Sequence, residues 1–418
     1  MLERKVVVVV GGGAAGVFGA IQLKELYQDI DVIILEKTLK LLTKVKISGG
    51  GRCNVTHHQF NPKELIKNYP RGQKELLGPF HFFQPQDMIA WLESRGVELK
   101  TEEDGRMFPI TDSSQTIIDC FMRELKIHGI EVFYETEMTG IEKNADETLK
   151  IETNRAAIKA DAILIATGSH PKNFELLKNL KVPTVDLVPS LFTFHLPNSF
   201  LNQLSGTVFE KGELKIADSN YQQIGPILVT HFGLSGPCTL KLSAFAARFL
   251  KEKDYKAQLK LNVDATSSFQ EKVQFLLGQK KNFPFKQLSS LPPFSLTKNA
   301  FIAILEQNQI NPAEKWGKVA DKKLENLAKF CHEMPLEMAG KSTYKEEFVT
   351  AGGVELKHVN LKTMEHKDFP RIFFAGEVLD VDGITGGFNF QNAWTTATIA
   401  AHGIEKYVKQ CVEVPCLS

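Results

Sequence analysis

Residues 6–16 read VVVVVGGGAAG, a run of β-branched residues that leads directly into three spaced glycines. The run predicts a buried strand. Gly11 permits a sharp turn out of that strand, Gly13 lets a pyrophosphate approach the backbone, and Gly16 lets the following helix pack closely on the sheet. Glu36 ends the next apolar run, where an acidic side chain accepts hydrogen bonds from a free ribose diol, as in FAD or NAD. The stretch therefore predicts a dinucleotide-binding unit.

The bulk composition sets broad limits on the class of protein. The chain has 418 residues, so two or three compact units are expected. Lys and Arg number 50 and Asp and Glu 49, a net charge of +1, which argues against a surface that coats nucleic acid or anchors to a membrane. The six cysteines are scattered, so reduced thiols are expected. We predict a cytoplasmic protein with a small-molecule substrate and no membrane partner. The net charge disfavours a nucleic-acid partner but leaves a local basic patch open.

Strand and helix patterns alternate up to about residue 187, which predicts an α/β fold. The expected strands cover 2–10, 32–35, 131–136 and 162–166, and the expected helices cover 14–27, 85–95 and 114–128. We predict one dinucleotide-binding domain in two parts, 1–187 and 346–418. Residues 188–345 form an insertion between them, which is β-rich over 188–262 and helical over 263–345. The lysines of that helical segment are interpreted as a solvated face.

Three further glycine-containing elements narrow the cofactor to a flavin. Residues 44–54 (KVKISGGGRCN) place three glycines between Ser48 and Arg52, so backbone is exposed to a planar or phosphorylated ligand. Residues 166–168 (ATG) end an apolar strand. Residues 376–391 (GEVLDVDGITGGFNFQ) contain the pair Gly386 and Gly387 at an expected helix start. Together these elements indicate one extended ligand contacted by both ends of the chain. FAD fits this pattern better than NAD.

The same stretches resemble the BaiN-like NAD(P)/FAD-dependent oxidoreductases, also catalogued as YhiN-type bacterial flavoproteins. The resemblance covers nearly the whole chain and rests on VVVVVGGGAAG, ISGGGRCNVT, PSLFTF, THFGLSGPCTL, FVTAGGVEL and FFAGEVLDVDGITGGFNFQNAW. It implies a Rossmann-like FAD-binding domain built from both chain ends and interrupted by an inserted domain with a β-barrel-like part and a helical part. Apart from the resemblance, no histidine or cysteine is placed for covalent attachment, so non-covalent FAD is expected, and without a second GxGxxG motif NAD(P)H is expected only as a transient co-substrate.

The resemblance further implies a set of cofactor contacts. These are Gly11, Gly13, Ala14, Ala15, Gly16, Glu36, Lys37, Lys44, Ser48, Gly49, Gly50, Arg52, Cys53, Asn54, Met138, Thr167, Gly168, Gly376, Glu377, Gly386, Gly387, Phe388, Asn389 and Gln391. The chain departs from the family pattern after Gly168, where a glycine-rich segment usual in relatives is shortened to SHPKNFE.

A few single residues are candidates for chemistry. His231, in the stretch THFGLSGP, could act as acid or base toward a substrate at the flavin, and a structural histidine is the alternative. Cys53 could be redox-active, but no second cysteine lies near it in sequence, which favours packing or cofactor contact. His57 and His58 lack a third ligand at metal spacing, so they are interpreted as solvated loop residues and no metal site is predicted.

These features predict an FAD-dependent oxidoreductase that transfers a hydride between flavin and a small organic substrate. NAD(P)H or oxygen would be the second redox partner, and no second GxGxxG motif is present to form a separate nicotinamide domain. The alternatives are a flavin amine oxidase and a flavoprotein whose main role is binding RNA or protein through the lysine-rich helical segment. The sequence does not determine the oligomeric state.

Overall fold

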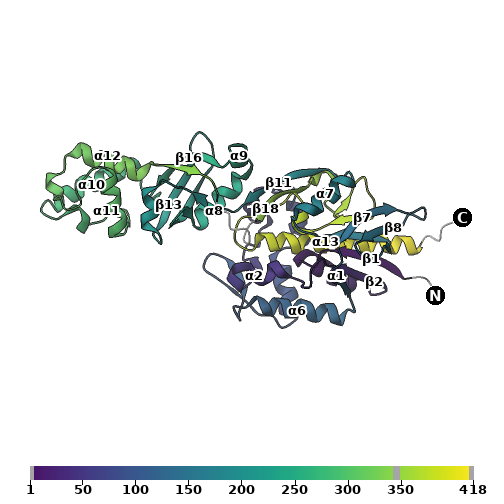
Figure 1. The fold of residues 1–418 in the computed structure, drawn as a ribbon. Coiled ribbons are helices and arrows are strands. Elements are labelled where there is room, and N and C mark those ends of the chain that lie inside the picture. The colour runs from purple at the N-terminus through teal and green to yellow at the C-terminus, as the bar shows by residue number, and fades with distance from the viewer. Residues whose placement is uncertain (1–3, 342–348, 414–418) are drawn as a thin grey trace. The chain divides into compact units, whose positions relative to one another are not determined.

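The computed structural model describes residues 4–341 and 349–413. The chain divides into two compact units (Figure 1): unit 1 consists of Met1–Leu187 with Thr350–Ser418, and unit 2 of Val188–Val349. The predicted second boundary, between 345 and 346, lies outside the described residues. None of the helices in the described ranges combines the length and the apolar character needed to cross a bilayer.

Unit 1 is built on a seven-stranded sheet in the order β19-β20-β21-β10-β1-β2-β6. The strands are β1 (Lys5–Val10), β2 (Ile30–Leu35), β6 (Glu131–Phe133), β10 (Ala162–Ile165), β19 (Val359–Asn360), β20 (Glu365–His366) and β21 (Ile372–Phe374). Parallel pairing joins β21, β10, β1, β2 and β6, whereas β19 and β20 pair antiparallel. The central strand β1 is fully buried at Val7, Val8 and Val9, as its unbroken β-branched run requires.

The predicted α/β fold, with a Rossmann-like domain formed by both chain ends, is confirmed. The expected strand 131–136 is shorter in the structure, because Glu135 adopts a φ of 51° that no strand continues through. The helices of unit 1 are α1 (Ala14–Leu26), α2 (Thr43–Gly51), α3 (Pro62–Leu65), α4 (Leu77–Phe82), α5 (Pro85–Glu93), α6 (Ser114–Ile127), α7 (Pro171–Asn179) and α13 (Phe388–Glu413).

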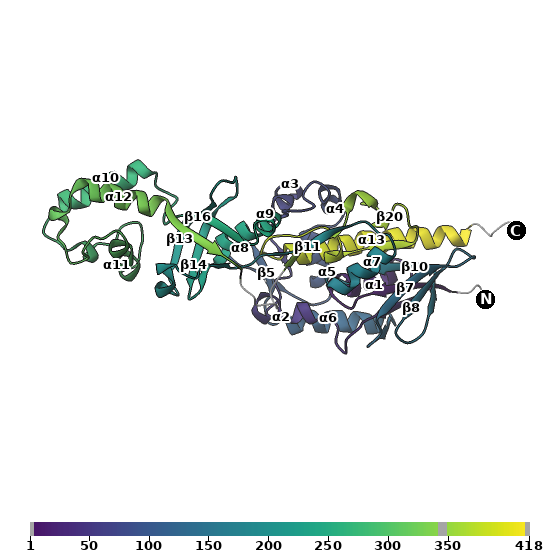
Figure 2. The ribbon, with the colours of Figure 1, turned by 45° about the horizontal axis from the view of Figure 1, so that its top comes forward.

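Helix α1 is buried on nearly all sides, because it packs on the sheet and against α13, which runs beside it in both views (Figures 1 and 2). A Cβ atom on Gly16 would lie 1.9 Å from the carbonyl oxygen of Gly11, so only glycine permits this approach. Two small antiparallel sheets complete unit 1, β3 (Thr56–His57) with β5 (Arg106–Pro109) and β4 (Leu99–Thr101), and β7 (Met138–Lys143) with β8 (Leu149–Thr153) and β9 (Ile158–Ala160).

The chain leaves unit 1 through β11 (Thr184–Ser190) and returns through β18 (Val349–Val354), and these two strands pair. Unit 2 contains a six-stranded antiparallel sheet: β12 (Phe194–His195), β15 (Gly233–Ser235), β14 (Gln222–Thr230), β13 (Val208–Ile216), β16 (Lys256–Asn262) and β17 (Met334–Ala339) in spatial order. A bridge between Phe194 and Lys341 and a 3.0 Å hydrogen bond from His195 N to Gly340 O join the two edges. The sheet therefore curls into the expected barrel-like form.

Helices α8 (Gly236–Phe245) and α9 (Ala247–Glu252) follow β15, and α10 (Phe269–Asn282), α11 (Lys298–Gln307) and α12 (Asp321–His332) form a helical segment between β16 and β17. The expected helical range 263–345 is too long at its end, because β17 returns to the sheet and alternates buried and exposed residues along Met334–Ala339. One apolar cluster, which includes Leu261, Leu276 and Trp316, extends from the sheet into the helical segment.

We predict that Gly16→Ala destabilises unit 1 strongly. The added methyl group must displace either the turn at Gly11 or the whole of α1, and overpacking of this kind costs about 3 kcal/mol or more. Thermal unfolding monitored by circular dichroism measures the loss. Gly78→Ala is the matched control, because a Cβ atom on Gly78 in α4 meets nothing within 4 Å and should leave the melting temperature nearly unchanged.

Candidate cofactor site

Four parallel strands of unit 1, β21, β10, β1 and β2, end at one edge of the sheet. The residues that follow them include Gly376, Thr167, Gly11 and Glu36, in the same order. Backbone hydrogen bonds continue past the strand ends, from Gly11 N to Leu35 O at 2.8 Å and from Ala375 N to Ile165 O at 3.1 Å. The edge where ligands bind in open parallel sheets thus gathers predicted contacts from both ends of the chain.

The Glu36 carboxylate is held beside the glycine turn. Its Oε2 accepts from Gly12 N at 2.9 Å, and its Oε1 accepts from the Thr38 backbone and hydroxyl, both at 2.8 Å. A carboxylate has about four acceptor positions and three are used here, so about one remains for a ribose hydroxyl. Lys37, next to it, is exposed.

The N-terminus of α1 is open to an anion. Gly13 is the N-cap residue, no side chain caps the helix, and no acidic residue lies in its first turn, which contains Ala14, Ala15 and Gly16. A Cβ atom on Gly13 would meet nothing within 4 Å, so the protein itself leaves space there. Uncapped N–H groups and the positive end of the helix dipole are suited to a pyrophosphate.

The predicted glycine loop at 48–51 is the irregular end of α2. Ser48, Gly49 and Gly50 leave helical geometry, and the Cys53 N donates to Ser48 O at 3.0 Å. Lys44 Nζ pairs with Glu377 Oε2 at 2.7 Å, which connects this segment to the other end of the chain.

Residues 54–56 are joined to the start of α13. With the amide of Asn54 oriented to suit its neighbours, its oxygen accepts from Gly387 N at 2.9 Å. Trp394 Nε1 donates to Val55 O at 2.9 Å, and Thr56 Oγ1 donates to Gln391 Oε1 at 2.6 Å. The N-terminal and C-terminal glycine elements are therefore one continuous structure.

Several predicted contact residues are engaged by the protein itself. Gln391 is fully buried between Thr56 and Thr395. Arg52 pairs with Glu102 at 2.6 Å and lies over the Phe108 ring at 4.0 Å. Asn389 exchanges two hydrogen bonds with Gly383, at 2.8 and 2.9 Å. These side chains support the site in the structure, and direct cofactor contact by them stays a prediction.

Gly387 is required by close packing within the protein. A Cβ atom there would lie 2.5 Å from Thr56 O, and the residue has a φ of 86°. A substitution at Gly387 would therefore disturb the protein before it met a cofactor. Gly386 lies two residues before α13, Gly168 follows β10, and Met138 is the first residue of β7.

His57 was interpreted from sequence as a solvated loop residue, and this is wrong. It lies half-buried in β3, its ring stacks on Phe388 with centroids 4.7 Å apart, and its Nε2 is 3.1 Å from Asp104 O. His58, by contrast, is exposed. The sequence could have indicated a buried position for His57 only through its place three residues after Asn54. Its stacking partner Phe388 lies more than 300 residues further along the chain.

Asn392, which sequence reasoning also missed, carries a buried amide without a partner. Its side chain is 1% exposed, and neither its oxygen nor its nitrogen makes a hydrogen bond to any described residue. It lies one turn ahead of Thr396, whose hydroxyl accepts from Gly376 N at 2.9 Å. An unpaired buried amide is unfavourable, so this position beside the strand edge suits a polar group of a ligand.

The loop that precedes α13 is fixed by a buried ion pair. Asp382 is fully buried and pairs with Arg71, and the two residues also form an isolated antiparallel bridge. Tyr69 adds a hydrogen bond from its hydroxyl to Phe388 O at 2.7 Å. Movement of the loop away from Arg71 would leave the buried carboxylate of Asp382 unpaired, which is strongly unfavourable. The ion pair therefore holds Gly383–Gly387 in place beside the strand edge.

Cys53 is a buried thiol rather than a nucleophile. Burial raises its pKa to about 12, while a hydrogen bond with Ser48 acts in the opposite direction. The thiol therefore stays protonated at neutral pH, and a redox role is disfavoured. No other described cysteine is paired with it.

The candidate acid–base residue His231 belongs to unit 2. It lies exposed in the turn between β14 and β15, with its ring edge-on to Phe232 at 4.7 Å. This exposure is compatible with proton transfer, and its catalytic role stays a prediction.

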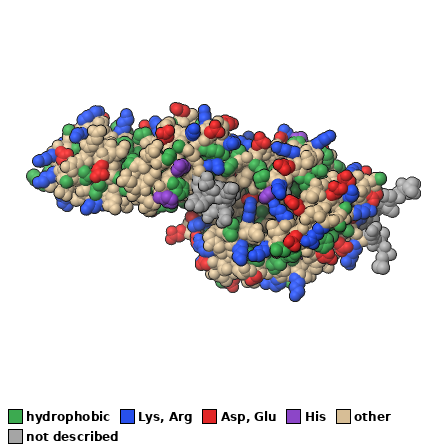
Figure 3. Space-filling view, in the orientation of Figure 1, with side chains coloured by type: hydrophobic (Ala, Val, Ile, Leu, Met, Phe, Trp, Pro, Cys, Tyr) green, Lys and Arg blue, Asp and Glu red, His purple; other side chains and the backbone are tan. Residues whose placement is uncertain are grey.

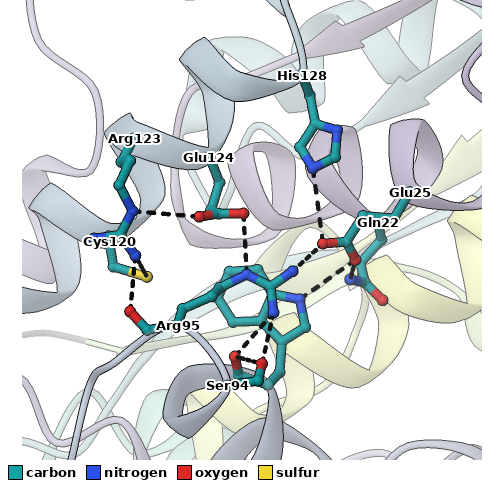
Figure 4. A network of polar contacts seen from close by, with 9 residues as sticks. Gln22, Glu25, Ser94, Arg95, Cys120, Arg123, Glu124 and His128 are labelled. Atoms are coloured by element: carbon teal, nitrogen blue, oxygen red, sulfur yellow. Dashed lines mark hydrogen bonds and ion pairs between the residues drawn. The ribbon is translucent and has the colours of Figure 1, made fainter.

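One side-chain cluster in the described ranges, Glu25, Glu124 and His128, has the spacing of a metal site. Figure 4 shows Arg95 between the two carboxylates, paired with Glu25 and 3.1 Å from Glu124 Oε2. The guanidinium also lies 3.8 Å from the centre of the Trp91 ring. The arginine thus compensates the acidic charge, and the cluster joins α1 to α6 as an ion-pair network.

The fold and the arrangement at the strand edge define a protein with a Rossmann-type nucleotide-binding domain. The chain belongs to the HI0933-like family, because the model of the HI0933-like protein Rossmann domain matches residues 5–403. The predicted resemblance is thereby confirmed.

Two curated relatives align over nearly their whole length. A ribosomal RNA dihydrouridine synthase of Haemophilus influenzae is 25% identical over 96% of this chain and 98% of its own. A 3-dehydro-bile acid delta(4,6)-reductase of Clostridium scindens is 24% identical over 94% of this chain and 97% of its own. Among solved structures, a 3-ketosteroid delta1-dehydrogenase from Sterolibacterium denitrificans has a TM-score of 0.51 at 10% identity and covers 96% of this chain and 100% of its own, which shows a shared fold.

We predict that Gly13→Ala weakens FAD binding without destabilising the apo-protein. The added methyl group meets nothing in the protein and keeps an extended backbone, but it would occupy the space proposed for the pyrophosphate. Titration of apo-protein with FAD, followed by flavin fluorescence, measures the dissociation constant. Gly78→Ala should bind FAD like wild type, and equal affinity of Gly13→Ala would contradict the proposed position of the pyrophosphate.

We also predict that Glu36→Gln raises the dissociation constant of FAD by about ten- to a hundredfold, because a charge-assisted acceptor is worth roughly 1.5–3 kcal/mol. Glutamine keeps the shape of the side chain but only one acceptor oxygen, so the hydrogen bond from Gly12 N or the one from Thr38 N is lost. Thermal unfolding of the apo-variant separates this loss from the loss of the ribose contact. Lys37→Gln, at an exposed neighbouring position, is the control. An unchanged affinity of Glu36→Gln would show that this carboxylate does not bind the ribose.

Proposed function

We propose that this protein is an FAD-dependent reductase that adds hydrogen across a carbon–carbon double bond conjugated to a carbonyl group, with a uracil base of RNA as substrate and NAD(P)H as reductant. The observation that supports this is the nearly full-length similarity to the two curated relatives. Formation of dihydrouridine saturates the C5=C6 bond of uracil, which is conjugated to a ring carbonyl. A 4,6-diene next to a 3-oxo group is conjugated in the same way, so one chemistry accounts for both names.

The residues at the strand edge fit FAD. The uncapped N-terminus of α1 would receive the pyrophosphate, Glu36 the ribose, and the unpartnered amide of Asn392 a polar group of the ligand. Bound FAD supplies hydride transfer at its N5 atom. NAD(P)H provides the hydride, and the double bond takes up one hydride at the carbon β to the carbonyl and one proton at the α carbon.

The proton for the α carbon requires an acid, and we assign this role to His231. Its exposure and its position in a glycine-punctuated turn support the assignment, because the side chain is free of hydrogen bonds to described residues. His231→Gln should slow substrate reduction while FAD reduction by NAD(P)H keeps its wild-type rate.

The distribution of charge supports RNA over a neutral small molecule. Residues 188–349 contain 20 Lys and Arg and 15 Asp and Glu, a net charge of +5, whereas the whole chain carries only +1. Unit 1 therefore has a net charge of −4. The near-neutral total that disfavours a nucleic-acid partner conceals this separation, and a basic unit attracts a polyanion.

The test is an anaerobic reaction of the holoprotein with NADPH and an unmodified ribosomal RNA transcript. Mass spectrometry of the digested RNA should show uridine converted to dihydrouridine. A parallel anaerobic reaction contains a 3-oxo-4,6-diene steroid and NADPH, and a separate reaction in air contains an amine without NADPH. Reduction of the steroid alone would overturn RNA as substrate. Oxygen-dependent oxidation of the amine, without reduction of either double bond, would overturn the proposed reaction.

A further inference from the structure

The helical segment of unit 2 carries exposed aromatic and basic side chains in one place. Phe285, in the turn after α10, is 83% exposed, and Phe283 is 37% exposed. The exposed lysines around them are Lys281, Lys286, Lys315 and Lys318. We refer to these six residues as the basic aromatic surface. Figure 3 shows Lys side chains around the part of unit 2 that contains α10, α11 and α12.

This surface is held in a defined shape by backbone contacts between two turns. Gln287 and Lys315 form an antiparallel bridge. Trp316 N donates to Lys286 O at 3.0 Å, and Gly317 N donates to Pro284 O at 2.9 Å. The Trp316 side chain beneath is fully buried in the apolar cluster of unit 2. The two turns therefore form one rigid surface rather than separate loops.

The lysines of this surface are available to an anion. Ion pairs in the described ranges engage none of Lys281, Lys286, Lys315 and Lys318. Of the acidic groups nearest in the chain, Asp321 pairs with Lys280 at 2.5 Å, and Glu314 is half-buried. Lys286 Nζ lies 5.2 Å from the Phe283 ring centre, which places a positive charge beside an aromatic face.

We propose that the basic aromatic surface binds single-stranded RNA, with a base stacked on Phe285 and phosphates near Lys281, Lys286, Lys315 and Lys318. This inference rests on the proposed reduction of uracil in RNA and identifies the part of the chain that recognises the substrate outside the cofactor site. An isolated exposed phenylalanine costs free energy in water, and a nucleobase covers it without needing a broad apolar surface. A membrane or a protein partner would need a larger apolar face than two phenylalanines provide.

The binding test uses fluorescence anisotropy of a labelled single-stranded RNA oligonucleotide with the holoprotein. Phe285→Ala should raise the dissociation constant about tenfold, the effect expected for loss of one base–aromatic stack, and Phe285→Trp should restore it. Ile224→Ala, which truncates another strongly exposed apolar side chain of unit 2, is the matched control and should bind like wild type. Equal affinities of wild type and Phe285→Ala would overturn the proposal.

A second measurement tests the lysines. The double variant Lys286→Ala with Lys315→Ala should reduce the slope of log K against log salt concentration by about 0.7 for each phosphate that a lysine no longer neutralises. Lys211→Ala with Lys256→Ala, on strands β13 and β16, is the control and should keep the wild-type slope. Equal slopes for both pairs would overturn the assignment, and so would binding of anionic lipid vesicles that is as sensitive to Phe285→Ala as RNA binding is.

Failure of this inference is distinguishable from failure of the proposed function. If wild type forms dihydrouridine while Phe285→Ala leaves RNA affinity unchanged, the surface is wrong and the reaction stands. If Phe285→Ala weakens RNA binding but no dihydrouridine forms, the surface stands and the reaction is wrong. FAD content and the rate of flavin reduction by NADPH without RNA should be equal in all variants, which shows that each one folds.

Discussion

Parallel pairing of β21 with β10, and of β10 with β1, determines where everything else in unit 1 lies. This pairing places β21, from the last part of the chain, beside β10 and β1 from the first part. The carboxyl ends of all three strands lie at one edge of the sheet. A parallel pair needs a long crossover connection, and here the connection between β10 and β21 includes the whole of unit 2. The pairing of β11 with β18 brings the exit and return of the chain together, so an insertion of this length leaves the sheet intact.

The same edge contains both tight packing and unsatisfied polar groups. Gly16 and Gly387 have no room for a side chain, because backbone carbonyl oxygens of Gly11 and Thr56 occupy that space. Gly13, by contrast, faces open space at an uncapped helix N-terminus, and the amide of Asn392 is buried without a partner. Close packing holds the site rigid, while the unsatisfied groups lower its stability until a ligand pairs with them.

Charge is divided between the two units in a way that suits different ligands. Unit 1 is net acidic, and the uncapped N-terminus of α1 supplies a local positive end at the strand edge. Unit 2 is net basic, and the lysines of its basic aromatic surface are exposed. A dinucleotide needs a few directed donors, whereas a polymer of phosphates responds to an extended positive field. This division would let one chain bind a compact anion tightly and a long one by many weak contacts.

The fold class and the main elements of unit 1 follow from local patterns in the chain, because the β-branched run at 6–10 and the spaced glycines act through local geometry. The sequence also predicted that glycine elements from both ends meet, since one extended ligand requires them to. Only the tertiary structure decided that Gln391 and Arg52 are engaged by Thr56 and Glu102 rather than left open. It also decided that His57 stacks on Phe388 and that the turn at Phe285 lies against the turn at Lys315. These contacts join residues far apart in sequence, and hydrophobic periodicity reports only which side of an element is buried, not which distant residue covers it.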